Sequence, residues 1–361
     1  MPPTPLIPNN RPIIFWLLST CFLIWLMIIL GGATRLTHSG LSIVEWKPIT
    51  GIIPPLNQTQ WVEEFAKYQQ FPEYNLINKG MSLSSFQFIY FMEYAHRLLG
   101  RLMGLWFIIP LIYFWSTSRL SPLLKRRAIF ALGLGIFQGF IGWYMVKSGL
   151  VKDPTVSHYR LTIHLALAIG LYGLLFWTAM ELMLTSDKEV IKPEPKIIRI
   201  LSLLCCLALS KTILYGGLVA GLKAGLIYNT FPLMGGQFIP GEWAFYHPIW
   251  INFGENPALV QWLHRWIAVS TIILILYTSW KTIILSPNQL TRIVSSAFAC
   301  VAISQGSLGI LTLLYQVPAT LGNLHQGVAI LLLSLGLSLF FLAKPQNKMS
   351  NFHLGREVEL V

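Results

Sequence analysis

Four histidines occupy matching positions in a sequence that is otherwise strongly apolar. His96 and His264 each precede an arginine, in "EYAHR" and in "QWLHR", whereas His164 and His325 stand in "LTIHLA" and "LGNLHQ". Imidazole is a common axial ligand of haem iron, and two imidazoles that face each other supply both axial positions. The residue types therefore indicate two haem sites, each with two histidine ligands.

One residue near the histidines differs between the two motifs. Glu93 stands three residues before His96, and Gln261 stands three residues before His264. This spacing places each side chain on the same helix face as its histidine. A carboxylate exchanges protons and an amide does not, so the reactive site is predicted to be the one that contains Glu93. The alternative is that Glu93 only forms an ion pair with Arg97.

Four arginines are candidates to bind the carboxylates of a haem. Propionates need cationic partners that make bidentate hydrogen bonds, and a guanidinium has this geometry. The candidates are Arg35, Arg97, Arg101 and Arg265. The alternative for each arginine is that its aliphatic part lies along apolar neighbours while its charge reaches the membrane surface.

Zinc fits these residues less well than haem iron does. It prefers cysteine, histidine and carboxylate ligands in a tetrahedral array. All four cysteines lie inside long apolar segments, so the loops supply no cysteine as a co-ligand or for a disulfide.

The elements that carry these residues are predicted to be membrane-spanning helices. Of the 361 residues, 54% are hydrophobic and 11% are charged, against about 25% charged in a typical soluble domain. Apolar segments of roughly twenty residues, the length of a helix that crosses a bilayer, recur along the chain. They cover residues 13–32, 87–115, 128–146, 160–184, 197–220, 258–280, 293–316 and 321–343. The sequence therefore predicts an all-α polytopic membrane protein with eight transmembrane helices.

The eight spans are predicted to form two four-helix bundles related by a parallel repeat. His264 follows His96 by 168 residues, and His325 follows His164 by 161 residues. "FQGFIG" is likewise echoed by "SQGSLG", and "GGATRL" is echoed weakly by "GGLVAG". An even number of spans in each repeat gives both copies the same orientation in the membrane. The predicted divisions are an N-terminal repeat at 1–184, a linker at 185–199, a C-terminal repeat at 200–343 and a tail at 344–361.

All four histidines fall near the outer ends of even-numbered spans, two in each repeat. A single such histidine would be explained by a hydrogen bond between helices or by a position near the headgroups. Four histidines at matched depth favour ligation, because ionisable side chains inside a membrane are costly and usually functional. The interior of a four-helix bundle is also an established place for such ligands.

Lysine and arginine residues in the connections predict the orientation in the membrane. With a cytoplasmic N-terminus, the inner segments hold 14 of these residues and the longer outer segments hold 8. Cytoplasmic loops carry such an excess of positive charge, and the N-terminal segment lacks the pattern of a transit peptide. We therefore expect a bacterial inner-membrane protein with both termini in the cytoplasm. The net charge of +12 follows from this distribution, and no nucleic-acid-binding motif accompanies it.

The first outer loop, at 33–86, contains a predicted amphipathic helix. Asn57 is a suitable N-cap, and Gln60 stands at the capping-box position. The predicted apolar face comprises Trp61, Phe65 and Tyr68. This helix is expected either to cover the reactive haem as a lid or to be an ordinary surface helix.

Long segments of the chain resemble haem A synthase, in its mitochondrial and proteobacterial branch. They include "GGATRLTHSGLSIVEWKPITGIIPPLN", "EFAKYQQFPEYNLINKGMSL", "MEYAHRLLGR", "AGLIYNTFPLMGGQFIP" and "LGNLHQG". The likeness covers nearly the whole chain. It implies an oxidoreductase that converts haem O to haem A for terminal oxidases, by oxidising the C8 methyl group of the porphyrin to a formyl group.

The resemblance also implies roles for the residues. It places haem O, the substrate, at His96 and His164. It places haem B, a cofactor, at His264 and His325. It makes Glu93 essential for catalysis, in agreement with the asymmetry described above.

The resemblance also implies several partners for the protein. They are a haem O synthase (a farnesyltransferase), cytochrome oxidase assembly factors and an unidentified electron donor or acceptor, and the chain is compatible with a homo-oligomer. Some bacterial members of the family carry cysteine pairs in the outer loops. This chain has none there, so a mechanism that uses them does not apply to it.

Two other functions are compatible with the histidines. One is a dihaem electron-transfer cytochrome, and the other is a haem transporter or chaperone without turnover. Neither of them requires Glu93 to differ from Gln261.

Overall fold

The computed structural model describes residues 10–47, 50–151, 154–186 and 192–344. These parts of the chain consist of helices and irregular connections, without a strand. Eight helices are long and apolar enough to cross a membrane, which confirms the eight predicted spans. They are α1 (Arg11–Leu36), α4 (Leu83–Ser116), α5 (Pro122–Gly149), α6 (His158–Ser186), α7 (Lys196–Gly221), α9 (Pro257–Leu285), α10 (Gln289–Leu314) and α11 (Ala319–Leu342).

Several long helices begin at a residue whose side chain caps the first turn. Ser82 Oγ accepts a hydrogen bond from the backbone N–H of Ser85 at the start of α4. Asn256 Oδ1 accepts from the backbone N–H groups of Ala258 and Leu259 at the start of α9. Such caps satisfy N–H groups that have no partner inside the helix. They fix where these helices begin, and so the depth of the side chains that follow.

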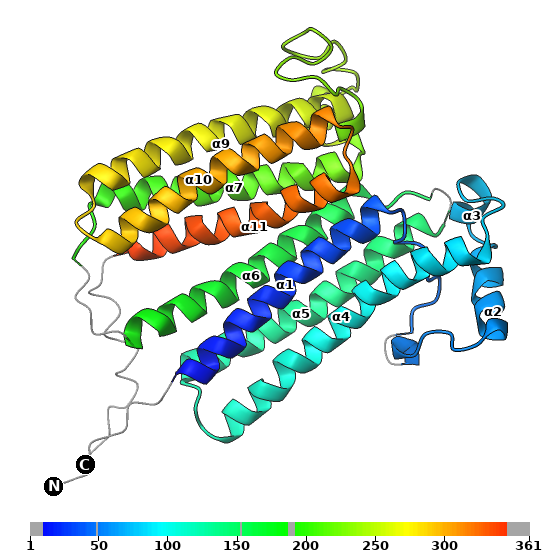
Figure 1. The fold of residues 1–361 in the computed structure, drawn as a ribbon, viewed down its shortest axis with the longest axis horizontal. Coiled ribbons are helices and arrows are strands. Elements are labelled where there is room, and N and C mark those ends of the chain that lie inside the picture. Colours follow the sequence, from blue (N-terminus) through cyan, green and yellow to red (C-terminus); the bar gives the residue numbers. More distant parts are fainter. Residues whose placement is uncertain (1–9, 48–49, 152–153, 187–191, 345–361) are drawn as a thin grey trace.

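The long helices form two four-helix bundles. Helices α1, α4, α5 and α6 pack together in the first half, and α7, α9, α10 and α11 pack together in the second. Figure 1 shows the two bundles next to each other, with the start of α1 and the end of α11 at the same end of the molecule. The predicted all-α polytopic fold is confirmed, and its long helices pack in two groups of four, as the repeat predicts.

The predicted domain divisions can be compared with the helix bounds. Helix α7 begins at Lys196, so the last residues of the predicted linker form its first turn. Residues 187–191 of that linker and residues 345–361 of the predicted tail lie outside the described residues.

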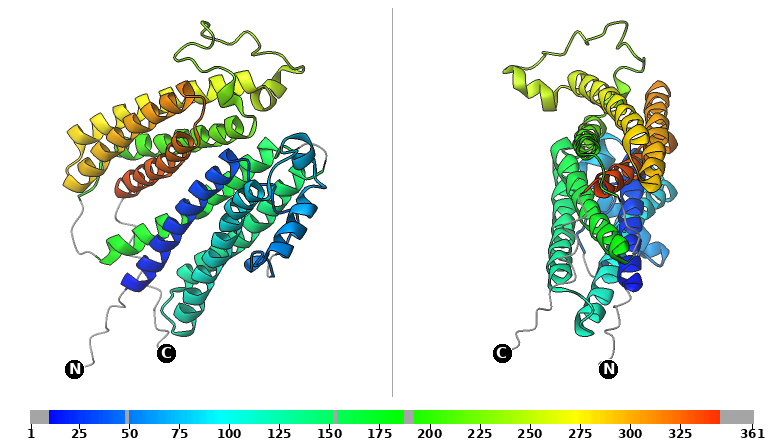
Figure 2. Two further views of the ribbon diagram at one scale, coloured as in Figure 1. Left: turned by 45° about the vertical axis from the view of Figure 1, so that its right-hand side comes forward. Right: turned by 90° about the vertical axis from the view of Figure 1, so that its left-hand side faces the viewer.

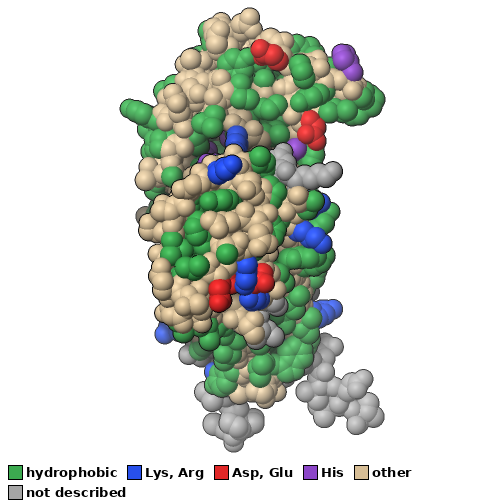
Figure 3. All heavy atoms as spheres, turned by 90° about the vertical axis from the view of Figure 1, so that its right-hand side faces the viewer, with side chains coloured by type: hydrophobic (Ala, Val, Ile, Leu, Met, Phe, Trp, Pro, Cys, Tyr) green, Lys and Arg blue, Asp and Glu red, His purple; other side chains and the backbone are tan. Residues whose placement is uncertain are grey.

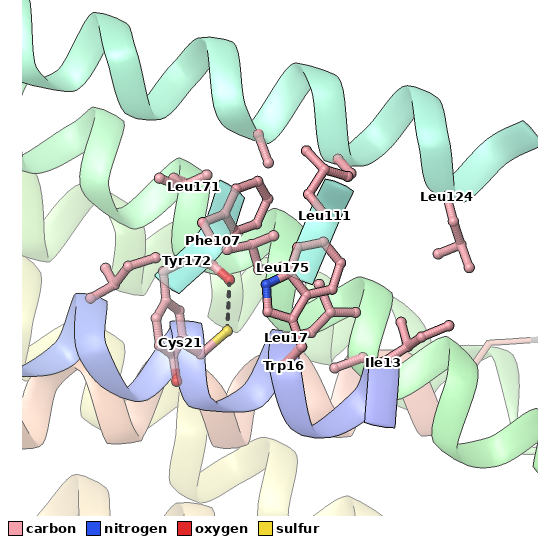
Figure 4. Close-up of a cluster of buried hydrophobic side chains, with 14 of the residues drawn as sticks. Ile13, Trp16, Leu17, Cys21, Phe107, Leu111, Leu124, Leu171, Tyr172 and Leu175 are labelled. Carbon is pink, nitrogen blue, oxygen red and sulfur yellow. Dashed lines mark hydrogen bonds between the residues drawn. The ribbon is translucent and has the colours of Figure 1, made fainter. Parts of the chain in front are cut away.

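All four helices of the first bundle contribute to its core. Trp16 of α1 packs against Phe107 and Phe114 of α4, with ring centroids 4.9 and 5.6 Å apart. Figure 4 shows Trp16 and Phe107 in this core, together with the contact between Cys21 and Tyr172 of α6. In this contact Cys21 Sγ donates to the carbonyl oxygen of Tyr172 at 3.8 Å. The second bundle has its own core around the fully buried Phe298.

The two bundles are joined through α1 and α6 on one side and α7 and α11 on the other. Trp25 Nε1 donates to the carbonyl oxygen of Gly327 at 3.0 Å, and Gln326 Nε2 donates to that of Ile28 at 2.6 Å. Polar bonds of this kind and small residues are typical of contacts between membrane helices. They define the register of α1 against α11.

The first outer loop contains the predicted amphipathic helix, α2 (Gln58–Tyr68), followed by α3 (Pro72–Leu76). Asn57 Oδ1 accepts from the backbone N–H of Gln60 at 3.0 Å, and Gln60 Oε1 accepts from the backbone N–H of Leu56 at 2.7 Å. The predicted N-cap is therefore confirmed.

The apolar face of α2 packs against α4 at its outer end. Trp61 and Tyr68 are buried, and the ring centroid of Tyr68 lies 5.2 Å from that of Phe86 on α4. The remaining short elements are η1 (Thr50–Ile52), η2 (Ala224–Leu226), η3 (Ile249–Ile251) and α8 (Asn252–Glu255).

Candidate functional site

The four histidines form two pairs, one in each bundle. His96 lies on α4 and His164 on α6, whereas His264 lies on α9 and His325 on α11. Within each bundle the two imidazoles are close enough to interact electrostatically. The structure therefore places one pair of the predicted ligands in each bundle.

Each histidine ring packs against a glycine on the neighbouring helix, and the four contacts are alike. A side-chain Cβ placed on any of these glycines would lie only 2.8–3.2 Å from the Cε1 atom of the ring. Such distances are too short for an undisturbed contact. The pairs are Gly31 with His96, Gly142 with His164, Gly216 with His264 and Gly309 with His325. Sequence analysis missed this role of the glycines, although all four stand in the repeated motifs "GGATRL", "FQGFIG", "GGLVAG" and "SQGSLG".

Two glutamines support the second histidine of each pair in the same way. Gln138 Nε2 donates to the backbone carbonyl oxygen of His164 at 2.9 Å. Gln305 Nε2 donates to that of His325 at 3.0 Å. Because the same bond recurs in both repeats, the histidine backbone is held at matching positions in the two bundles.

Three of the four imidazole Nδ1 atoms make no hydrogen bond within the described residues. The Nδ1 atoms of His96, His164 and His325 are buried without a hydrogen-bond partner in the described residues. His264 Nδ1 lies 3.1 Å from the carbonyl oxygen of Thr212. Buried polar atoms normally have partners, so these rings are poorly explained as structural hydrogen-bonding groups.

Glu93 is at the centre of a hydrogen-bond cluster at the outer end of α4, where its side chain is 3% exposed. One carboxylate oxygen accepts from Ser42 Oγ and from the backbone N–H of Ile43, both at 2.8 Å. The other accepts from Arg97 Nε at 3.0 Å and from Arg97 Nη2 at 2.6 Å. The ion pair between Glu93 and Arg97, which the sequence offered as the alternative role of Glu93, is therefore present. It belongs to a hydrogen-bond cluster that also holds the loop after α1 through Ser42 and Ile43.

Gln261 takes the place of Glu93 in the second bundle. Its Nε2 donates to the carbonyl oxygen of Tyr228 at 3.0 Å, and its Oε1 is buried without a partner in the described residues. Arg265 donates to the carbonyl oxygens of Thr230 and Tyr228, each at 2.6 Å. In both bundles this pair of side chains binds the loop that follows the preceding helix, but only the first bundle provides a carboxylate.

The other candidate arginines bind backbone carbonyls at separate places. Arg35 Nη1 donates to Ala220 O at 2.9 Å and so joins α1 to α7. Arg101 Nη2 donates to Lys47 O at 2.9 Å. Arg97 also donates to the backbone carbonyls of the loop after α1. The four arginines are therefore distributed around the histidine end of the molecule, and Arg97 is the one whose hydrogen bonds to Glu93 are seen in the described part of the chain.

A cavity of about 370 Å³ lies at the histidine end of the molecule, between α2, the loop after α1 and the first half of α4. Arg97, Arg101 and Tyr90 line it from α4, and charged groups of the loops line the other side. Hydrogen bonds from Lys47 and Lys67 hold the pKa of Glu45 in this lining below its usual value. The cavity reaches Arg97, and it therefore lies directly beside the Glu93 cluster.

The fold and these sites define a polytopic membrane protein with one buried histidine pair in each of two parallel repeats. The profile of the family described as cytochrome oxidase assembly protein matches residues 14–337, and the chain belongs to this family.

Three relatives illustrate the similarity, each named "Heme A synthase". The protein of Flavobacterium psychrophilum is 44% identical over 332 residues, which cover 90% of this chain and 96% of the relative. That of Rhodospirillum centenum is 42% identical over 335 residues, covering 93% and 89%. That of Rickettsia bellii is 44% identical over 336 residues, covering 91% and 97%. The similarity thus extends over both repeats.

Proposed function

We propose that this protein is a haem A synthase, an oxidoreductase that converts haem O to haem A by oxidising the C8 methyl group of the porphyrin to a formyl group. The observation that supports this most directly is that two closely matching histidine sites differ at Glu93 and Gln261. A haem carrier or an electron-transfer cytochrome needs two axial ligands for each haem. It does not need a carboxylate beside only one of the two sites.

Haem O binds as the substrate in the first bundle, with His96 and His164 as axial ligands. The imidazole rings suit this role because Gly31 and Gly142 leave room for them, and because their Nδ1 atoms have no hydrogen bond within the described residues. Four-helix bundles hold cofactors between facing side chains in this way.

Haem B is the resident cofactor of the second bundle, held by His264 and His325. The donor set fits it, since two imidazoles backed by Gly216 and Gly309 lie in one bundle. When bound, haem B supplies one-electron transfer at a potential that its ligands set. Gln261 offers an amide beside this pair, so the second bundle has no carboxylate there for proton transfer.

Glu93 is the catalytic residue. Its bonds from Ser42, Ile43 and Arg97 hold the carboxylate in one position, one helical turn from His96. Oxidation of a methyl group releases protons, and a carboxylate at this position accepts one of them or orients a water molecule. The cavity beside Arg97 connects this cluster to the outer face.

The arginines hold the propionates of the two haems. Arg35 is well suited to this role because, in the described part of the chain, only its Nη1 donates to a backbone carbonyl. Arg97, Arg101 and Arg265 are the other partners, in addition to the backbone bonds described above. The guanidinium geometry favours bidentate contacts with carboxylates.

The protein acts in a bacterial inner membrane with both termini in the cytoplasm. Its substrate is supplied by a haem O synthase, a farnesyltransferase. Its product is used in the assembly of terminal oxidases, together with other assembly factors. An electron acceptor must take up the electrons removed from the methyl group.

Co-expression with a haem O-producing farnesyltransferase tests this function. Haems extracted from the membranes are separated by chromatography, and we expect haem A only when both proteins are present. Haem O without haem A, from membranes that contain the full-length protein with bound haem, would instead identify a carrier or an electron-transfer cytochrome.

A further inference from the structure

The second outer loop, between α7 and α9, has an unusual composition for a connection at a membrane surface. Between α7 and α9, residues 222–256 contain three charged side chains: Lys223 and Glu255 near the two ends and, in the long stretch between them, only Glu242. Tyr228 donates a hydrogen bond to its carboxylate at 2.5 Å. The first outer loop, at 37–82, contains seven Lys and Glu residues. The first outer loop therefore has the charge of a water-facing loop, whereas the second has a composition that suits contact with lipid.

Two asparagine side chains of the second outer loop point inward, whereas Gln237, Glu242 and His247 are exposed. Asn252 is fully buried, and its side chain bonds to the backbone of Tyr246 and of Ile249. Asn256 is buried as well and donates to the side chain of Asn252 and to the carbonyl oxygen of Glu242. These two asparagines close the segment 242–256 into a compact loop and bond to the backbone of Glu242, Tyr246 and Ile249.

The apolar side chains of the same segment point outward. Phe245 and Trp250 are each 69% exposed, and Trp243 and Phe253 are exposed as well. An arrangement with amides inside and aromatic rings outside is the reverse of a water-facing loop. Backbone groups must be satisfied internally wherever a segment meets lipid, and tryptophan and tyrosine prefer the boundary between headgroups and acyl chains.

The loop lies where it can meet that boundary. Figures 1 and 2 show it extending from the outer ends of α7 and α9, on the side of the second bundle away from the first bundle. It is tied to α9, because Trp262 Nε1 donates to Phe238 O at 2.8 Å and Phe238 packs against Trp266. Figure 3 views the outer face and shows hydrophobic side chains over this projecting end.

We propose that residues 243–253 insert into the outer leaflet of the membrane as an interfacial anchor of the second bundle. The partner is the phospholipid interface itself, recognised by burial of aromatic and aliphatic side chains. The near absence of charge means that anionic headgroups are not required. The anchor uses none of the residues assigned to haem binding or catalysis, so it does not depend on the proposed function.

The first outer loop provides a matched contrast within the same chain. Its helix α2 buries Trp61 and Tyr68 against α4 and exposes Glu63. With its aromatic side chains buried and Glu63 exposed, helix α2 is oriented for contact with water. A probe at Glu63 therefore reports a water-facing outer loop in the same preparation.

Nitroxide labels on single cysteines test the anchor in nanodiscs of zwitterionic lipid. The variants are Phe245→Cys, Trp250→Cys and, as control, Glu63→Cys, each with Cys300→Ser because Cys300 is the exposed native cysteine. We expect labels at 245 and 250 to be accessible to oxygen, which concentrates in lipid, and shielded from a water-soluble nickel reagent. The label at 63 should show the opposite pattern.

Three results would overturn the proposal. Labels at 245 and 250 that match the label at 63 would show a water-facing loop. Labels shielded from both reagents would show that protein, either another copy or another region, covers this face. If the labels at 245 and 250 differed from the label at 63 only in nanodiscs of anionic lipid, charge and not apolar burial would drive the contact.

Discussion

At the scale of single residues, the Glu93 cluster has a structural role, and we propose a chemical role for its carboxylate. Glu93 binds Ser42 and Ile43 of the loop after α1 and also forms the ion pair with Arg97. In the second bundle, Gln261 and Arg265 bind the corresponding loop without a carboxylate. Since an amide suffices to hold the loop there, the carboxylate of the first bundle is explained by chemistry better than by loop attachment.

Glu93→Gln is therefore expected to abolish synthesis while leaving the fold intact. The amide keeps the shape of the side chain and one acceptor oxygen, but its nitrogen cannot accept the hydrogen bonds that Ser42, Ile43 or Arg97 donate to one carboxylate oxygen. The amide also cannot accept a proton, and general acid–base catalysis contributes about 10²–10⁴-fold in rate. Membranes with the variant should contain normal amounts of protein and haem B but accumulate haem O or a partly oxidised product. Chromatography of extracted haems measures this.

Two control variants separate the catalytic role from the structural one. Gln261→Glu should leave activity largely intact, and Ser42→Ala removes one hydrogen bond to Glu93 without touching its carboxylate. Normal haem A from Glu93→Gln, or a loss in Ser42→Ala equal to the loss in Glu93→Gln, would contradict a catalytic role.

The glycines behind the histidines give a second prediction at this scale. A Cβ on Gly309 would lie 2.8 Å from His325 Cε1, so Gly309→Ala should displace the ring. Overpacking of this kind costs about 1–3 kcal/mol, which corresponds to roughly a 5- to 150-fold loss of affinity for haem B. The low-spin haem absorbance of purified protein, titrated with haem, measures this loss, and His325→Ala should remove the same signal.

Gly139→Ala is the matched control, because no atom lies within 4 Å of the Cβ that this substitution adds. It should leave haem content unchanged. Equal loss of haem in Gly139→Ala and Gly309→Ala would show that helix flexibility, and not space for the imidazole, explains the glycines.

At the scale of elements, the sequence predicted the helices well and their contacts poorly. The eight spans and α2 followed from apolar length and from the Asn57 cap, which are local signals. Membrane helices are apolar toward lipid as well as toward each other, so the pattern of hydrophobicity does not mark the packed face. The contact of Gly31 with His96 and the inward asparagines of the second outer loop depend on distant parts of the chain and could not be read from spacing.

The first outer loop contains a buried acid that the proposed chemistry does not use. Glu73 on α3 is 5% exposed and accepts a hydrogen bond from Tyr68 at 3.0 Å. Burial raises the pKa of Glu73 to about 7, the Tyr68 hydrogen bond opposes this shift, and the nearby Glu93 and Lys223 act in opposite directions. This acid is therefore a candidate for pH-dependent stability of the loop.

The stability of the α2–α3 region should fall as pH rises through 7. Between the ordinary pKa of 4.5 and the raised value of about 7, the folded loop keeps a proton that the unfolded loop has released. Raising the pH over this range therefore favours the unfolded loop. Hydrogen exchange measured at several pH values, after correction for the intrinsic rate, should show decreasing protection of residues 58–76.

Glu73→Gln removes the titrating group and keeps an acceptor for Tyr68. Its loop protection should be nearly independent of pH over the same range. If the variant retained the full pH dependence, another group would be responsible for it.

At the scale of the whole molecule, the two repeats are docked so that the four histidines lie toward one side of the membrane. Each repeat has an even number of spans, so both keep the same orientation, and the bonds of Trp25 to Gly327 and Gln326 to Ile28 join them. Electron exchange between the two proposed haems and contact with an acceptor would then take place near the same surface. Which surface this is depends on the distribution of positive charge.

The orientation can be tested with reporter fusions. Cytoplasmic segments carry the excess of Lys and Arg, and the loops at the histidine end, which follow α1, α5, α7 and α10, carry fewer of these residues than the segments at the opposite end. A reporter that is active only in the periplasm should therefore be active when fused after Lys79 or Gln237. It should be silent when fused after Arg126 or Lys192, with comparable amounts of each fusion verified by immunoblot. The reverse pattern would place all four histidines, the Glu93 cluster and the aromatic loop on the cytoplasmic side, and the proposed anchor would then have to lie in the inner leaflet.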